Sequence, residues 1–269
     1  MDLRVFLLNS ALPCAALLAA AAPAAPPPGP SSRPPAQEAG DEVAASYRKL
    51  ADAQDEAGLA KLWREHPDLV LVTIDADLEG SLALRERSRN PDESAIAAMH
   101  ARALRGARAA VAAGLHPILA DYAAAFTGWD ATQQKQFRAG QAAFGKAHAA
   151  AKDGRHDEAL AAANECVALA EPLGDWWGTA MGFSVTGDAL SALGRHDEAL
   201  VALGRARALH HDLGLSGAEY GNLRAMVEAL RAQGGGRRLQ ELARQGALLG
   251  RALGDAAGAA LLEELSEGR

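Results

Sequence analysis

The sequence predicts an all-α protein, and three observations support this. Apolar residues make up 49% of the 269-residue chain and are mostly Ala and Leu, which are strong helix formers, whereas aromatic residues make up only 4%. Apolar side chains recur at three- and four-residue intervals in most segments, as they do along one face of a helix. The segment GRHDEAL at 154–160 also returns unchanged at 194–200. A fixed spacing of this kind marks repeated supersecondary units.

Residues 1–22 have the pattern of a signal peptide. An apolar stretch follows Arg4, and Ala19 and Ala21 fit the small-residue pattern that precedes a cleavage site. We therefore expect an exported protein, periplasmic or secreted, that does not associate with a membrane once the signal is removed. The alternative is an uncleaved N-terminal membrane anchor, although the stretch barely reaches across about 30 Å of hydrocarbon.

Residues 23–40 are rich in proline and predict a disordered linker, because such a composition buries too little apolar surface to offset its ordering entropy. A helical N-terminal region is expected over 41–132. Its first helix should start near Asp41 and continue to Pro67. Three more helices are predicted, the first with the apolar stripe Leu71, Ile74, Leu78 and Leu82, the second from Asp92 to about Ala113, and the third from Leu115 to Phe126.

Residues 133–269 carry the repeat. In each unit a first helix should end before the glycine at 154, 194 or 234, and a second helix should end before the Leu-Gly pair at 173–174, 213–214 or 253–254. A lone helical hairpin cannot bury its apolar face, so neighbouring hairpins are expected to stack and share a core.

The second unit carries large and small residues in a recognisable order: Phe183, Gly187, Leu190, Gly194, Ala199, Leu203 and Ala206. This order resembles the tetratricopeptide repeat (TPR), in the longer variety of about 40 residues found in kinesin light chains and bacterial signalling proteins. The resemblance covers residues from about 135 to 269. It implies a TPR-like solenoid, preceded here by an irregular helical region.

By this resemblance, the first helix of each unit lines a concave surface that binds a protein or peptide of unknown identity. The partner-binding residues that it implies are Gln141, Phe144, His148 and Lys152 in the first unit, Ser184 and Asp188 in the second, and Arg224, Glu228 and Arg231 in the third. The Lys and Asn clamp with which some TPR proteins hold a C-terminal carboxylate is absent from the matching positions. The resemblance therefore favours a scaffold or adaptor other than a chaperone-tail receptor.

Composition and motifs narrow the function further. The net charge of −7, with scattered Lys and Arg, lacks the basic surface that nucleic acid requires. No catalytic set stands at a recognisable motif spacing, so we expect no enzyme and no cofactor. We expect Cys166 to be a buried structural thiol, Trp176-Trp177 to lie between repeats, and His210-His211 to form a solvated helix end.

An alternative function is a sensory or regulatory module that binds calcium or a small ligand through the N-terminal helical region. The candidate ligands resemble those of an EF-hand loop: Asp75, Asp77, Glu79, Ser81 and Glu86. The apolar stripe through Ile74, Leu78 and Leu82 explains the same segment as a helix without a metal. We therefore prefer the helix and expect no bound metal.

Overall fold

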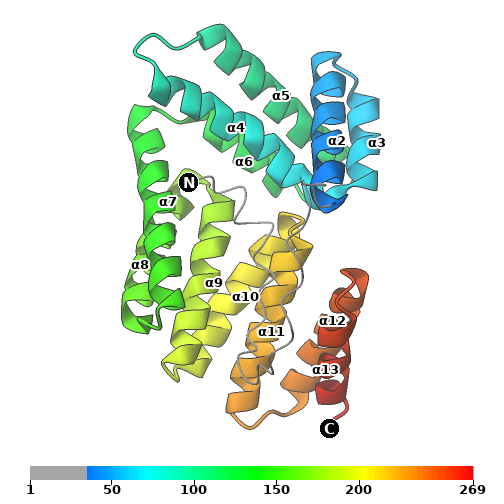
Figure 1. Ribbon diagram of the computed structural model, residues 1–269, viewed down its shortest axis with the longest axis vertical. Coiled ribbons are helices and arrows are strands. Elements are labelled where there is room, and N and C mark those ends of the chain that lie inside the picture. The colour runs from blue at the N-terminus through cyan, green and yellow to red at the C-terminus, as the bar shows by residue number, and fades with distance from the viewer. Residues whose placement is uncertain (1–34, 269) are drawn as a thin grey trace, which may run out of the picture.

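The computed structural model describes residues 35–268, which contain helices and connecting turns and no strand. The prediction of an all-α protein is therefore confirmed (Figure 1). The α-helices are α2 (Pro35–Asp52), α3 (Glu56–Glu65), α4 (Val70–Arg87), α5 (Glu93–Ala112), α6 (Ile118–Gly128), α7 (Ala131–Lys152), α8 (His156–Ala170), α9 (Trp176–Ala192), α10 (His196–Asp212), α11 (Ser216–Ala232), α12 (Arg237–Ala252) and α13 (Ala256–Ser266). Short 3-10 helices cover Pro67–Leu69 and Glu171–Leu173.

The N-terminal elements differ from expectation in two ways. The expected signal peptide and the linker up to residue 34 lie outside the described residues. Helix α2 begins at Pro35, so residues 35–40, which we expected in the linker, are helical. Proline is favoured in the first turn of a helix because its fixed φ suits the helix and its missing N–H would have no intrahelical partner there.

The single helix expected between Asp41 and Pro67 is in fact two helices, α2 and α3. The chain turns at Gln54, whose φ of 58° is in the left-handed region. Asp55 then caps α3, because its carboxylate accepts a hydrogen bond from the Gly58 N–H at 2.8 Å. The same Asp-x-x-Gly cap opens α9 at Asp175 and α13 at Asp255, so this spacing was the signal that the sequence offered.

One turn geometry joins the two helices in each of the first two repeat units. The Arg155 N–H donates to the Ala150 carbonyl at 2.9 Å, and the Arg195 N–H donates to the Leu190 carbonyl at 2.8 Å. The glycine before each of these donors has a positive φ, 74° at Gly154 and 75° at Gly194. These bonds close the helix end as in a Schellman motif, satisfying carbonyls that lack an intrahelical partner. Consecutive helices therefore run in opposite directions.

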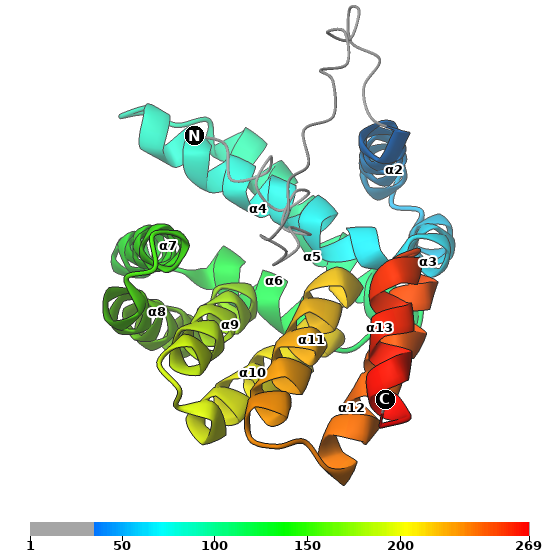
Figure 2. The ribbon, with the colours of Figure 1, turned by 60° about the horizontal axis from the view of Figure 1, so that its bottom comes forward.

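Helices α7 to α13 follow one another in a curved row (Figure 2). Helices α7, α9 and α11 lie on the inner side of this curve, and α8, α10 and α12 lie on the outer side. The N-terminal helices α2 to α6 form a separate group at one end of the molecule in Figure 1.

The largest core joins the N-terminal group to the row. Tyr47, Trp63 and Tyr122 share this core with Ala180 of α9 and with Leu213, which follows α10. Trp176 and Trp177 pack against the same core, so they lie where α9 meets the N-terminal group and not between two repeat units as expected. A second core lies within α10 to α13.

Candidate functional site

The predicted partner-binding residues begin with Gln141, and its amide is already bound within the chain. The Gln141 Nε2 donates to Glu79 of α4 at 2.5 Å, and Arg138 donates to the Gln141 Oε1 at 2.7 Å. Arg138 also pairs with Glu79 and Glu86, at 2.7 Å in each case. Helix α4 thus occupies the N-terminal part of α7, and Gln141 holds the N-terminal group in place.

The next residues along α7 are less covered. Phe144 is half-buried and packs against the small cluster of Ala147, Ala163 and Val185. Its ring centroid lies 6.2 Å from that of His148. Burial, and then the charge of Lys152, lower the pKa of His148 below its ordinary value, so the imidazole is neutral at pH 7. Lys152 itself is exposed.

Asp188 is the residue of α9 that best fits a binding role. It lies nearly half a helical turn from both Thr186 and Leu190, which face α8 and α10, so its side chain points to the inner side of the row. Its side chain is exposed and makes no hydrogen bond or ion pair with any described residue. Protein atoms nevertheless surround it on its other sides, and this partial desolvation raises its pKa to about 6.

Ser184, one turn before Asp188, is used inside the fold. Its hydroxyl donates to the Asn222 Oδ1 of α11 at 2.9 Å, and the Asn222 Nδ2 lies 2.8 Å from the His210 Nδ1. Burial lowers the pKa of His210 to about 4, so its neutral ring accepts this hydrogen bond. His210 is therefore a buried structural residue, and the expectation of a solvated helix end is wrong for it. His211 is exposed and lies 3.0 Å from the Glu219 carboxylate.

The three predicted residues of α11 do not form one group. The Arg224 guanidinium lies 5.7 Å from the Tyr220 ring centroid. Glu228 and Arg231 are exposed and form an ion pair with each other at 3.7 Å. Of the nine predicted residues, the structure brings together Phe144 with His148, and Glu228 with Arg231, while Gln141 and Ser184 bond to other parts of the chain.

The alternative calcium loop is wrong, because residues 75 to 86 lie inside the continuous helix α4. A helix cannot wrap its side chains around one ion as a loop does, and these groups have protein partners. Asp75 accepts from the Tyr122 hydroxyl at 2.5 Å, Asp77 from Tyr47 and Arg102, and Glu79 and Glu86 from Arg138, while the Ser81 hydroxyl donates to the Leu78 carbonyl. Within residues 35–268 no group of His, Cys, Asp or Glu is placed to hold a metal ion.

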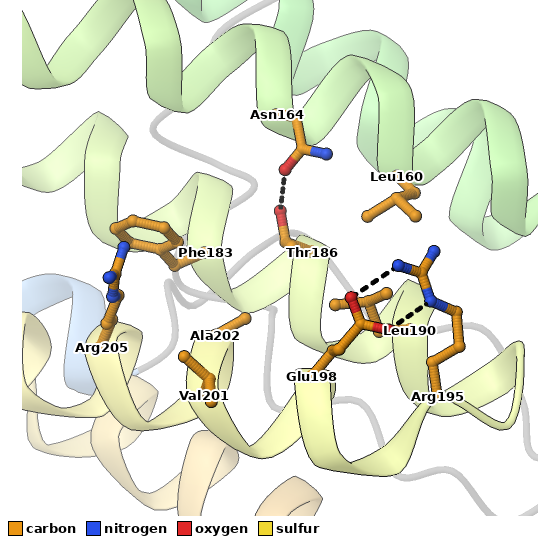
Figure 3. A pocket seen from close by; sticks show the side chains of 10 residues that line it. All are labelled: Leu160, Asn164, Phe183, Thr186, Leu190, Arg195, Glu198, Val201, Ala202 and Arg205. Carbon is orange, nitrogen blue, oxygen red and sulfur yellow. Dashed lines mark hydrogen bonds and ion pairs between the residues drawn. The ribbon is translucent and has the colours of Figure 1, made fainter.

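Sequence reasoning missed a cavity of about 420 Å³ on the other side of α9 (Figure 3). We call it the outer groove. Helices α8 and α10 flank it, and α9 forms its floor. Its lining residues are Leu160, Asn164, Phe183, Thr186, Leu190, Arg195, Glu198, Val201, Ala202 and Arg205. One end carries Arg205 above the Phe183 ring, and the other carries the ion pair of Arg195 with Glu198.

The single described cysteine is buried, as expected. Cys166 is 1% exposed, and burial, followed by the charges of Asp175 and Glu165, raises the pKa of its thiol to about 12. A thiol in this state is a poor nucleophile, because the thiolate is the reactive form.

No known family model matches the sequence, and no curated protein matches it significantly. Among the described helices, none has both the length and the apolar character needed to span a membrane.

Proposed function

We propose that this protein is an exported, non-catalytic scaffold or adaptor that holds a protein or peptide on the inner side of a TPR-like solenoid. The supporting pattern is the 40-residue spacing, which runs from Gly154 to Gly194 and Gly234 and is accompanied by the same turn at Gly154 and Gly194 and by a longer glycine turn at Gly234. Proteins built from such units usually present an extended concave surface to a partner. Fold alone does not determine what is bound, so the proposal depends on the surface residues.

The observation that carries the proposal is the isolated carboxylate of Asp188. A charged group that is partly desolvated and lacks a partner gains free energy when a ligand supplies an opposite charge. Arg138 and Gln141, which bond to α4, precede Phe144, His148 and Lys152 along α7. The proposed binding surface is therefore the C-terminal half of α7 and α9, together with the exposed Glu228 and Arg231 of α11.

A photo-crosslinking experiment in cells tests this proposal. A photoreactive amino acid replaces Asp188 in one variant and Lys61, exposed on α3, in a matched control. We expect one crosslinked partner from position 188 and none of it from position 61. In a second pair of strains the photoreactive amino acid replaces Lys152, and one of the two strains also carries Asp188→Arg. This pair shows whether the Asp188 carboxylate is needed for binding.

The charge-reversed variant must remain folded, which its melting temperature and helical circular dichroism establish. Loss of the crosslink in folded Asp188→Arg would support the inner surface as the binding site. Equal crosslinking from positions 188 and 61, or an unchanged partner in Asp188→Arg, would refute it.

A further inference from the structure

The residues that line the outer groove differ between one repeat unit and the next. Helices α8 and α10 both pack on α9 but scarcely touch each other, and the equivalent helices one repeat later are α10 and α12 on α11. Two of the lining positions carry larger residues in the later unit. Met226 stands where the first groove has Thr186, and Leu242 stands where it has Ala202, and both of these larger residues belong to the second core. Two other positions carry smaller residues there, because Gly204 stands where the first groove has Asn164 and Leu223 where it has Phe183.

The polar groups of the two positions differ in the same way. Arg207 of α10 donates to Gln245 of α12 at 2.9 Å and so ties the later pair of helices together. In the first groove the residue equivalent to Arg207 is Val167, which has no donor, and the residue equivalent to Gln245 is Arg205. The exposed Arg205 guanidinium therefore lies over the Phe183 ring, 5.4 Å from its centroid, without a carboxylate partner among the described residues.

The remaining lining is mostly apolar and open to solvent. Val201 is 61% exposed at the groove edge, beside an apolar floor. Leu190 forms part of that floor, and Leu160 of α8 lies at one side of it (Figure 3). Arg195 and Glu198 neutralise each other at the far end, so the net charge available to a ligand is the positive charge of Arg205.

We propose that the outer groove binds a peptide segment in which an apolar side chain is followed by a carboxylate. The apolar side chain occupies the space beside Ala202, and the carboxylate pairs with Arg205. A peptide fits better than a free amphiphile because the groove lies open between two helices and encloses no pocket around a hydrocarbon chain. This site is separate from the inner surface, since Thr186 and Asp188 lie on opposite sides of α9.

The test uses the full folded chain and a capped probe peptide, acetyl-Gly-Ser-Leu-Glu-Ser-Gly-amide. Methyl NMR signals of Val201 are followed as the peptide is added to about 5 mM, which detects dissociation constants near 1 mM. We expect saturable shifts with this probe, and weaker binding when its Glu is replaced by Gln or its Leu by Ser.

Variants taken from the other repeat unit give the sharpest control. Ala202→Leu installs the residue found at the equivalent position of the later unit, so it should keep or raise the melting temperature while weakening peptide binding at least tenfold. Arg205→Gln should weaken binding about fivefold, which is the upper end of the range for an exposed ion pair. This variant should bind the Glu and Gln probes with equal affinity. Arg237→Gln, an exposed change on α12, and Asp188→Arg on the inner surface should leave binding unchanged.

Several results would overturn the proposal. These are no saturable shift in the wild type, full binding in folded Ala202→Leu, or equal affinity of the wild type for the Glu and Gln probes. If octanoate binds at least as tightly as the peptide, the ligand of the outer groove is an amphiphilic acid and not a peptide. Because Asp188→Arg removes the proposed inner site alone, the two proposals can fail separately.

Discussion

Gly187 of α9 packs closely against α10, and its replacement by alanine tests this packing directly. A Cβ at this position would lie 2.4 Å from the Leu203 Cγ and 2.7 Å from its Cδ2. The corresponding pairs in the other units are Ala147 with Ala163, and Val227 with Ala243. The third unit also places a larger residue opposite a smaller one, in the reverse order, whereas the first unit has two alanines.

The expected free energies follow from two opposing effects. Overpacking of a core typically lowers the free energy of unfolding by about 1–3 kcal/mol. We assign Gly187→Ala about 3 kcal/mol, because the new Cβ would meet the branched Cγ of Leu203, which cannot easily move away. Alanine recovers up to about 1 kcal/mol over glycine within a helix, so the net loss is about 2 kcal/mol. After Leu203→Ala, which itself costs about 2–5 kcal/mol, the clash is gone and the same change should instead stabilise by about 1 kcal/mol.

Urea unfolding followed by circular dichroism measures both free energies. Gly204→Ala on α10 is the matched control, because a Cβ there meets nothing within 4 Å, and it should stabilise the protein by up to about 1 kcal/mol. If Gly187→Ala stabilises the wild type as much as Gly204→Ala does, the close crossing does not limit the packing and the reasoning fails.

Three more predictions concern charged side chains that the fold buries or pairs. Burial raises the pKa of Asp175 to about 7. Between about pH 4 and pH 7 the folded state therefore retains a proton that the unfolded state has released. The free energy of unfolding should fall as the pH rises through this range, by at most about 4 kcal/mol. Asp175→Asn, which keeps an acceptor for the Gly178 N–H, should flatten that dependence in urea unfolding at several pH values; an unchanged slope would contradict it. Arg138→Gln should lower the free energy of unfolding by about 1–3 kcal/mol and should accelerate hydrogen exchange in α4 more than in α12. Equal acceleration in both helices would argue against a local effect. Calcium should leave the melting temperature unchanged within about 1 °C, because the α4 carboxylates are already paired; a rise that Asp75→Ala abolishes would restore a calcium site.

Local sequence signals predicted much of the helical structure correctly. Asp92 caps α5 as expected, and Leu71, Ile74, Leu78 and Leu82 are all buried on one stripe of α4. The turn between α2 and α3 was missed because Gln54 occupies the left-handed position that glycine usually fills, which hid a turn marked elsewhere by Leu-Gly-Asp.

The candidate binding residues were harder to predict from the sequence. The resemblance to the tetratricopeptide repeat singled out Asp188, which is exposed, but it could not show that Gln141 bonds to Glu79 or that Ser184 bonds to Asn222. Each of these partners lies on a different helix, far away in the sequence. A pattern within one helix therefore identifies a face but not what covers it.

The sequence by itself determined the helices, their turns and the repeat spacing, because capping, glycine conformations and apolar periodicity act over a few residues. Only the tertiary structure decided which surfaces remain available. It brought α4 against α7, and it placed Ala202 at the outer groove and Leu242 in the second core. Both outcomes depend on the volumes and charges of side chains that meet only after the helices have packed.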